Sequence, residues 1–133
     1  KLNEVRLRVD SQNELNGAIL ATGFPFKQPS LMPTQFAIMN NLIDEAADFR
    51  RTGSAALDLC YVASGRVDGY FEMGLKPWDC AAGDLIVREA GGLVCDFNAG
   101  HGYLRSGNIV AAPARILKEM LNKIQPCLTE QVK

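Results

Sequence analysis

The residues with the clearest chemical potential lie in a stretch that runs from Glu72 to Gly83. Pro77 and Trp78 stand directly before Asp79, so we expect Asp79 at or beside a helix N-terminus, where the helix dipole favours a carboxylate. Small residues follow it and leave room for a ligand or a neighbouring segment to approach closely. Glu72 and Asp79 are therefore candidate functional carboxylates, although helix capping alone would also explain Asp79.

A second candidate site lies at the start of another expected helix, in the segment Arg50–Ala56. Gly53 and Ser54 precede that helix, whose first backbone N–H groups lack partners within the helix and bind anions or hydroxyl groups. Arg50 and Arg51 add guanidinium groups, which suit phosphate. A capped helix preceded by two surface arginines would explain the same residues without any ligand.

Other catalytic arrangements find little support. The single histidine, His101, lies in a glycine-rich turn, so Ser54 has no evident partners for a serine hydrolase. The cysteines form no C-x-x-C pair and fit no zinc pattern; they are Cys60, Cys80, Cys95 and Cys127. We interpret them as reduced, structural thiols, which fits a protein of the cytoplasm.

The composition is that of an ordinary globular chain. Of its 133 residues, 47% are hydrophobic and 22% are charged, which indicates one domain or a piece of a larger one. The formal net charge of −1 gives no long-range attraction to nucleic acid or to an anionic membrane. The apolar runs fall short of the ~20 residues of a membrane span. Because the chain opens with Lys1 inside a strand-like alternation over residues 1–9, we expect it to be cut from something longer.

Strands and helices alternate along the rest of the sequence. Apolar or alternating runs predict strands at 18–22, 66–72, 93–97 and 108–111, with a strand or extended connector at 48–52. Helices are expected to begin at Pro33, at Ser54 and near Trp78, and a last one covers about 114–124. This order predicts an α/β or α+β fold in which helices cover a sheet.

Residues at helical spacing support each of these helices. They are Phe36, Met39 and Ile43 (with Leu42 and Ala46 beside them), then Ala55, Leu59 and Val62 on one face, then Ala82, Leu85, Ile86 and Glu89, and finally the stripe of Leu117, Met120, Leu121 and Ile124.

Three ordered segments resemble the inositol monophosphatase family. Pro77–Gly92 resembles the family signature W-D-x-A-A-G, followed by an apolar helix and E-A-G-G. Arg51–Leu59 and Gly65–Glu72 resemble two further motifs, in the family's order and spacing, and Ala21–Phe26 is similar to one bacterial branch in particular. The resemblance covers nearly the whole chain.

The resemblance implies the family's layered αβαβα fold, with a mixed sheet flanked by helices and with residues 1–133 as its C-terminal part. It also implies magnesium-dependent hydrolysis of inositol 1-phosphate or of a similar small polyol phosphate.

Site residues follow from the same resemblance, position by position. Asp79 resembles the family's C-terminal magnesium ligand, and Glu72 resembles the carboxylate that accepts hydrogen bonds from inositol hydroxyls. The segment that lines the substrate site corresponds to Gly53, Ser54 and Ala55, with serine where the family has threonine, and Arg50 is a further expected substrate contact.

The family's other metal ligands lie upstream, in a glutamate pair and in a D-P-D-G-T motif, and neither string occurs in this sequence. Magnesium requires near-octahedral oxygen coordination, so a single carboxylate holds it weakly. We therefore expect the N-terminal metal-binding half to be absent from this chain and the chain alone to be inactive.

Alternative functions stay open at this point. Related families share the W-D-x-A-A-G element, so the substrate could be a sugar bisphosphate or a nucleotide phosphate. The bacterial branch is associated with RNA polymerase and ribosomal RNA synthesis, which implies a regulatory partner bound through exposed charges. The candidate contacts are Arg50, Arg51, Lys76 and Arg88. We expect the whole protein to form a homodimer and to have no membrane partner.

Overall fold

The computed structural model describes residues 14–128, which form an α/β fold; the strand expected within residues 1–9 lies outside them. The strands are β1 (Ile19–Thr22), β2 (Asp48–Arg50), β3 (Gly69–Glu72), β4 (Leu93–Cys95) and β5 (Ile109–Ala112). The helices are α1 (Met32–Leu42), α2 (Ala55–Ala63), α3 (Pro77–Glu89), α4 (Tyr103–Ser106) and α5 (Ala114–Ile124), with 3₁₀ turns at Pro29–Leu31 and Gln125–Cys127. The predicted alternation of strands and helices is confirmed, while the short α4 and the 3₁₀ turns were not predicted.

The strands form one mixed five-stranded sheet in the order β2-β1-β3-β5-β4. β1 runs parallel to both of its neighbours, β2 and β3, whereas β5 runs antiparallel to β3 and β4. The carboxyl ends of β1, β2 and β3 therefore lie at the same edge of the sheet, where open α/β sheets bind ligands.

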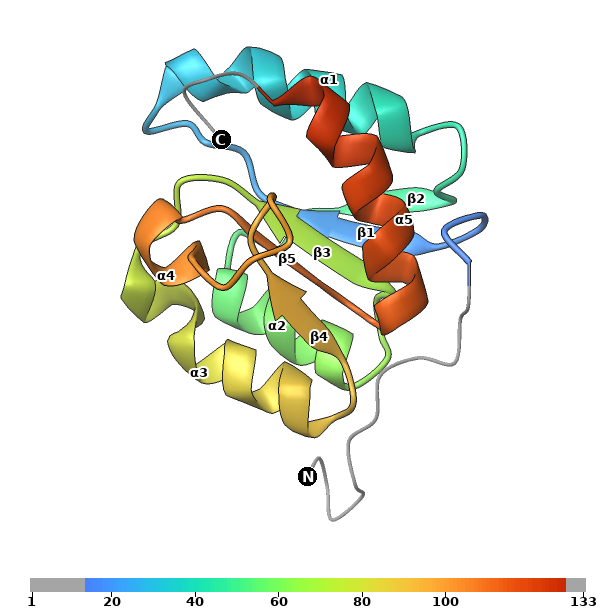
Figure 1. Cartoon of the computed structure of the whole chain (residues 1–133), viewed down its shortest axis with the longest axis vertical. Helices are drawn as coiled ribbons and strands as arrows, with labels where there is room; N and C mark the ends of the chain where they lie inside the picture. The colour runs from blue at the N-terminus through green and yellow to red at the C-terminus, as the bar shows by residue number, and fades with distance from the viewer. Residues whose placement is uncertain (1–13, 129–133) are drawn as a thin grey trace.

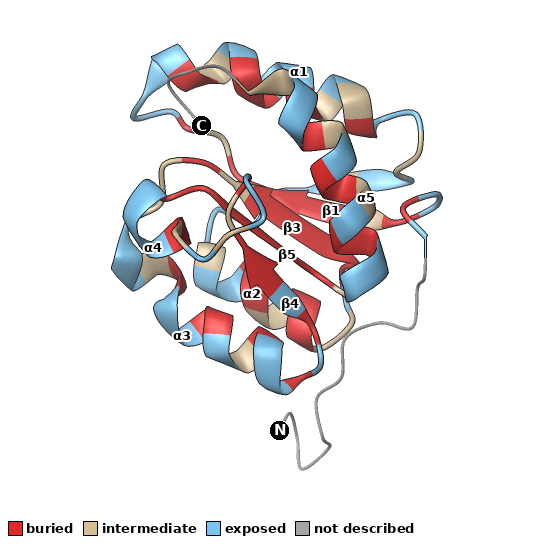
Figure 2. Ribbon diagram, viewed as in Figure 1, coloured by how far each residue is buried: buried red, intermediate tan, exposed pale blue. Residues whose placement is uncertain are grey.

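Two helices cover each face of the sheet: α1 and α5 lie on one side, and α2 and α3 lie on the other (Figure 1). Each face carries its own apolar core, and β1, β3 and β5 are almost entirely buried, whereas the edge strand β2 is largely exposed (Figure 2). β3 shows why, because successive side chains of a strand point to opposite faces. Phe71 packs into the core beneath α1 and α5, and its neighbour Tyr70 packs into the core beneath α2 and α3.

The apolar residues at helical spacing are all buried on α5, whereas of those around α1 only Leu42 is fully buried, and Met39 and Ala46 are partly buried against the core. On α1 the large side chains of Phe36 and Ile43 are exposed, and the buried face instead includes Gln35 and Ile38. The Nε2 of this glutamine donates a hydrogen bond to Thr22 Oγ1 at 3.0 Å, which offsets part of the loss of water, while its buried Oε1 has no partner among the described residues.

On α3 the residues at helical spacing do not mark the buried face, because Leu85, Ala82 and Glu89 are exposed. The buried face consists of Cys80, Gly83, Asp84 and Val87. This face packs on α2, and at Gly83 the two helices are so close that a Cβ would collide with Leu59. Hydrophobic periodicity therefore points to the wrong side of this helix.

All four cysteines are free thiols, and Cys80 and Cys95 are buried. Burial, followed by the nearby charge of Asp96, raises the pKa of Cys95 to about 11, so this thiol is a weak nucleophile at neutral pH. Within residues 14–128 no helix has the length and apolar character needed to cross a membrane.

Candidate functional site

A pocket with a volume of about 690 Å³ lies at the sheet edge where β1, β2 and β3 end. Three loops and the start of α3 form it: residues 24–28 after β1, residues 53–56 at the start of α2, and residues 72–76 after β3, together with Trp78 and Asp79. The parallel arrangement of the three strands brings these loops together. Five of the six site residues expected from the sequence line this one pocket; they are Gly53, Ser54, Ala55, Glu72 and Asp79.

Asp79 lies in the first turn of α3, directly after Pro77 and Trp78. Its Oδ2 accepts a hydrogen bond from the backbone N–H of Lys76 at 2.9 Å, so the carboxylate does cap the helix. Capping uses one of the two carboxylate oxygens and leaves Oδ1 as a second acceptor in a residue that lines the pocket. The capping interpretation and the functional one are therefore compatible.

Glu72 is the last residue of β3, and its carboxylate is half-buried in the pocket. The phenol of Tyr70 donates a hydrogen bond to Glu72 Oε1 at 2.6 Å. Burial raises the pKa of Glu72 above its ordinary value, and the charges of Asp58 and Asp79 act in the same direction. The Tyr70 hydrogen bond and the positive charge of Arg51 act against this rise.

The loop before α2 has the geometry of an anion or hydroxyl site. Gly53 has a φ of +84°, in the left-handed region that glycine adopts without strain. Ser54 is extended, and its hydroxyl caps α2 by accepting a hydrogen bond from the backbone N–H of Leu57 at 3.2 Å. The remaining free N–H groups of the first turn, beginning at Ala55, lie at the pocket.

The two adjacent arginines differ in position. Arg50 does not line the pocket; its Nε pairs with Asp48 Oδ2 at 2.9 Å on the exposed edge strand. The guanidinium of Arg51 lies 5.3 Å from the ring centre of Phe26 and 6.0 Å from that of Phe24, and both rings line the pocket. The role of Arg50 in binding substrate stays a prediction. No feature of the sequence distinguishes the two arginines. β2 ends at Arg50, and the next residue, Arg51, is the one that lies beside the aromatic rings of the pocket.

Sequence reasoning also missed a buried carboxylate behind the loop. Asp58 lies in the first two turns of α2 and is 1% exposed. Thr52 Oγ1 donates a hydrogen bond to Asp58 Oδ1 at 2.9 Å and accepts one from the backbone N–H of Ser54 at 3.1 Å. Burial raises the pKa of Asp58 to about 6, and the Thr52 hydrogen bond opposes that rise. Asp58 lies inside the segment Arg51–Leu59 that resembles a family motif, but the resemblance gave it no role.

Within residues 14–128 no group of three or more His, Cys, Asp or Glu side chains is arranged to hold a metal ion. Glu72 and Asp79 are two carboxylates in one pocket, and near-octahedral magnesium would need its remaining oxygen ligands from water, from a bound phosphate or from elsewhere in the protein. The described part of the chain therefore does not fit magnesium by itself, and Asp79 as a metal ligand stays a prediction.

The fold is that of one protein family. The chain belongs to the inositol monophosphatase family, whose sequence profile matches residues 1–130. The resemblance that the ordered motifs indicated is thus confirmed, as is the mixed sheet flanked by helices.

Within the family, the proteins that are similar to this chain include SuhB proteins. A curated relative described as Nus factor SuhB, from Haemophilus influenzae, is 83% identical over 128 residues, which are 96% of this chain and 48% of the relative. The crystal structure of extragenic suppressor protein SuhB from Bartonella henselae is 40% identical with a TM-score of 0.88, and the match covers 92% of this chain and 47% of that one. An inositol monophosphatase structure from Anabaena is 35% identical with a TM-score of 0.86 and covers 93% and 51%.

The chain spans about half the length of the curated relatives it matches. That the missing half is the N-terminal, metal-binding one stays a prediction, as does the boundary of the domain at residues 1–133.

Proposed function

We propose that the whole protein to which this chain belongs works with the transcription machinery as a Nus factor of the SuhB type. The observation that carries this proposal is the 83% identity, over 96% of the chain, to a relative described as Nus factor SuhB. The same proposal locates the protein in the cytoplasm, in agreement with the interpretation of its cysteines as reduced thiols.

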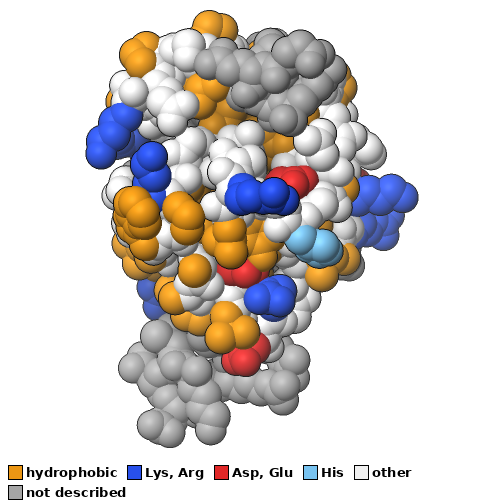
Figure 3. All heavy atoms as spheres, turned by 60° about the vertical axis from the view of Figure 1, so that its left-hand side comes forward, with side chains coloured by type: hydrophobic (Ala, Val, Ile, Leu, Met, Phe, Trp, Pro, Cys, Tyr) orange, Lys and Arg blue, Asp and Glu red, His pale blue; other side chains and the backbone are white. Residues whose placement is uncertain are grey.

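The surface around the pocket supports a macromolecular partner. On the face to the left in Figure 1, basic side chains lie among exposed hydrophobic ones (Figure 3). Trp78 is 78% exposed at the pocket rim, and Lys76 stands two residues before it. Exposed tryptophan beside a cation is typical of residues that dominate protein interfaces. Of the predicted contacts, Arg50 and Arg88 already pair with Asp48 and Asp84, so Lys76 and Arg51 are the stronger candidates.

A pull-down with purified components tests this role. Tagged full-length protein is expected to retain RNA polymerase together with other Nus factors, and the Asp79→Asn variant is expected to retain them equally. Lys76→Glu is expected to weaken retention at least severalfold, whereas Lys118→Glu on the exposed face of α5 serves as the control. Failure of the wild-type protein to retain any transcription protein would contradict the proposal.

We further propose a second function for the same protein, the hydrolysis of a small phosphate monoester such as inositol 1-phosphate. Its support is the convergence of Glu72, Asp79 and the N-terminus of α2 on one pocket in a chain of this family. The free N–H groups near Ser54 would hold the phosphate or a hydroxyl group, and Glu72 would accept hydrogen bonds from polyol hydroxyls. Magnesium is the proposed cofactor, with Asp79 as one ligand and the others supplied by the rest of the protein.

Steady-state kinetics of the full-length protein test this second function. Asp79→Asn preserves the acceptor that caps α3, so we expect turnover to fall by roughly 100-fold or more, the range of a lost catalytic charge, with little change in melting temperature. Asp44→Asn, an exposed aspartate far from the pocket, is the matched control. A panel containing inositol 1-phosphate, a sugar bisphosphate and a nucleotide 3′-phosphate identifies the substrate class. Normal turnover in Asp79→Asn would remove Asp79 from the chemistry. We expect residues 1–133 alone to be inactive.

A further inference from the structure

The Glu72 carboxylate has two close neighbours to which the family resemblance assigned no role. On one side, the hydroxyl of Tyr70 donates a 2.6 Å hydrogen bond to Oε1, and Tyr70 has no exposed surface. On the other side lies Gly23. A Cβ at Gly23 would stand 2.5 Å from Glu72 Cδ and 2.7 Å from Oε2, and it would be closer still to Oε1. These distances are shorter than real Cβ contacts, so the carboxylate occupies space that any side chain at position 23 would take.

The sheet fixes both neighbours. Tyr70 and Glu72 are two residues apart on β3, so their side chains point to the same face. β1 and β3 are parallel with Thr22 beside Phe71, and Gly23 directly follows the last residue of β1. Because Tyr70 lies on β3 and Gly23 follows directly on β1, the register of these two strands determines which residues surround the carboxylate.

We propose that Tyr70 and Gly23 lock the Glu72 carboxylate in place as the hydrogen-bond acceptor that selects phosphate monoesters of polyols over esters without hydroxyl groups. Tyr70 occupies Oε1, Gly23 provides the space, and Oε2 is left to accept from a ligand hydroxyl. Tyr70 is thus a positioning residue, and Gly23 determines specificity through the side chain that it lacks. The inference rests on the proposed phosphatase function and names the group that reads its substrate.

The electrostatics of the pair agree with this geometry. Burial raises the pKa of Tyr70 far above its ordinary value, and the charge of Glu72 adds to the rise, so the phenol stays protonated and serves only as a donor. A donor fixed on one oxygen favours the ionised carboxylate, which opposes the effect of burial on Glu72. The ionised group accepts hydrogen bonds and donates none, so it recognises hydroxyl groups and repels further anions.

The test compares two substrates of the full-length protein. Inositol 1-phosphate carries hydroxyl groups beside the ester, whereas p-nitrophenyl phosphate carries none. The measured quantity is the ratio of kcat/KM for the first substrate to that for the second. Tyr70→Phe keeps the buried ring and removes the donor; Gly23→Ala displaces the carboxylate and requires no unusual φ. Each is expected to lower the ratio about tenfold, as the loss of a hydrogen bond to a charged group does, mainly through KM for the polyol ester.

Tyr103→Phe is the matched control, because Tyr103 also donates a 2.6 Å hydrogen bond to a carboxylate, that of Asp84, but does not line the pocket. It is expected to leave the ratio within about twofold, below the cost of one lost hydrogen bond. If Glu72→Gln lowers the ratio while Tyr70→Phe and Gly23→Ala both leave it unchanged, the lock is overturned and the site stands. If Glu72→Gln also leaves it unchanged, the assignment of Glu72 to substrate binding fails as well.

A measurement independent of activity separates the two proposals further. In protein labelled with ¹³C at glutamate side chains, the signal of Glu72 is assigned by its loss in Glu72→Gln and titrated in wild type and in Tyr70→Phe. The lock predicts a higher pKa for Glu72 in Tyr70→Phe, because the variant loses the donor that favours the ionised form. An unchanged pKa overturns the lock even if the protein hydrolyses no phosphate ester. A raised pKa in an inactive protein supports the lock and refutes the phosphatase.

Discussion

Two hydrogen bonds of the same length, each from a tyrosine hydroxyl to a carboxylate, lie in different regions of this molecule. Tyr103 donates to Asp84 Oδ2 at 2.6 Å at the contact between α4 and α3, and Tyr70 donates to Glu72 Oε1 at 2.6 Å in the pocket. In both pairs the phenol stays protonated at neutral pH: burial, followed by the hydrogen bond to Asp84, raises the pKa of Tyr103 to about 12, and burial raises that of Tyr70 further. The donors are alike, so the difference between the pairs lies in the carboxylates.

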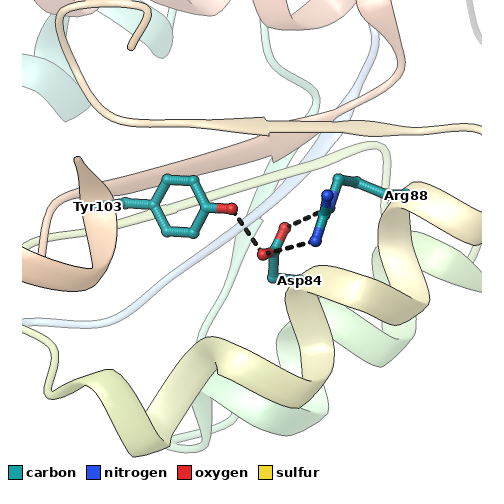
Figure 4. A network of polar contacts seen from close by, with 3 residues as sticks. All are labelled: Asp84, Arg88 and Tyr103. Carbon is teal, nitrogen blue, oxygen red and sulfur yellow. Dashed lines mark hydrogen bonds and ion pairs between the residues drawn. The ribbon is translucent and has the colours of Figure 1, made fainter. Parts of the chain in front are cut away.

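Asp84 is fully satisfied, as Figure 4 shows. Arg88 donates from Nε to Oδ1 at 3.0 Å and from its second nitrogen to Oδ2 at 3.2 Å, and the carboxylate is 5% exposed. Among the described residues Glu72 has one hydrogen-bond donor, Tyr70, and its other oxygen belongs to a residue that lines the pocket. A carboxylate with every oxygen occupied can only hold the fold together, whereas one with a free acceptor at a pocket can bind a ligand.

The largest expected effect that separates the pairs comes from removing each carboxylate. Asp84→Ala leaves the buried Tyr103 hydroxyl without its acceptor and Arg88 without its partner. We expect the free energy of unfolding of the full-length protein to fall by about 2–3 kcal/mol, the cost of an unsatisfied buried group. Glu72→Gln keeps an acceptor for Tyr70, so we expect a change below about 1 kcal/mol. Urea unfolding of both variants measures this, and equal losses would erase the distinction between the pairs.

A pair of glycines sharpens the same contrast with one substitution. A Cβ at Gly83, the last residue of the W-D-x-A-A-G element, would lie 2.6 Å from Leu59 Cδ1 and 2.7 Å from Leu59 Cβ, so α3 and α2 can approach only because that atom is absent. Gly83→Ala is expected to cost about 2 kcal/mol of stability, as overpacked cores do. Gly23→Ala meets the terminal carboxylate of Glu72, which borders the pocket and can turn into it, so we expect a smaller cost than for Gly83→Ala together with a change in substrate selectivity.

Two measurements on each glycine variant test this contrast between stability and selectivity. They are the melting temperature and the ratio of kcat/KM for the two substrates. The expected pattern is reciprocal: lost stability with retained selectivity at Gly83, and the reverse at Gly23. A Gly23→Ala variant that melts as early as Gly83→Ala would show that position 23 serves the core.

Local sequence features were enough to predict the order of the strands and helices and the residues of the pocket loops. Gly53, Ser54 and Asp79 stand at helix starts, and Glu72 ends an alternating strand, so their neighbours in the chain determine their geometry. Helical spacing does not by itself give the buried faces of α1 and α3, because tertiary partners decide them: Thr22 accepts from Gln35, and Leu59 requires a glycine opposite.

The neighbours of Glu72 illustrate what local patterns leave out. Gly23 lies 49 residues away from Glu72 in the sequence, and only the parallel register of β1 and β3 brings the two together. Arg51 and Arg50 are chemically identical, and the point at which β2 ends separates their roles. Such pairings depend on strand register and crossover geometry, which hydrophobic periodicity does not encode.

A further small effect is expected at Asp58, which shares one feature with each of the two carboxylates. It is buried, as Asp84 is, but among residues 14–128 its carboxylate accepts a hydrogen bond from one side chain, that of Thr52. Its pKa is raised from 3.8 to about 6 by burial, against the Thr52 hydrogen bond. Between these pH values the folded protein binds a proton that the unfolded chain does not, so stability from this group is present at low pH and is lost as pH rises through 6. The sign of this pH dependence is opposite to that of a salt-bridged aspartate.

Asp58→Asn removes the buried charge and keeps an acceptor for Thr52, but it adds an amide donor that needs a partner of its own. We therefore expect a net gain of about 1 kcal/mol at pH 8, well below the roughly 3 kcal/mol equivalent of the shift, and a smaller gain at pH 5. Thermal unfolding at both pH values measures it, with Asp44→Asn as the exposed control. A variant that loses more stability at pH 8 than at pH 5 would mean that the ionised carboxylate is satisfied in the fold, as Asp84 is, and that the contrast between occupied and unoccupied carboxylates does not extend to this one.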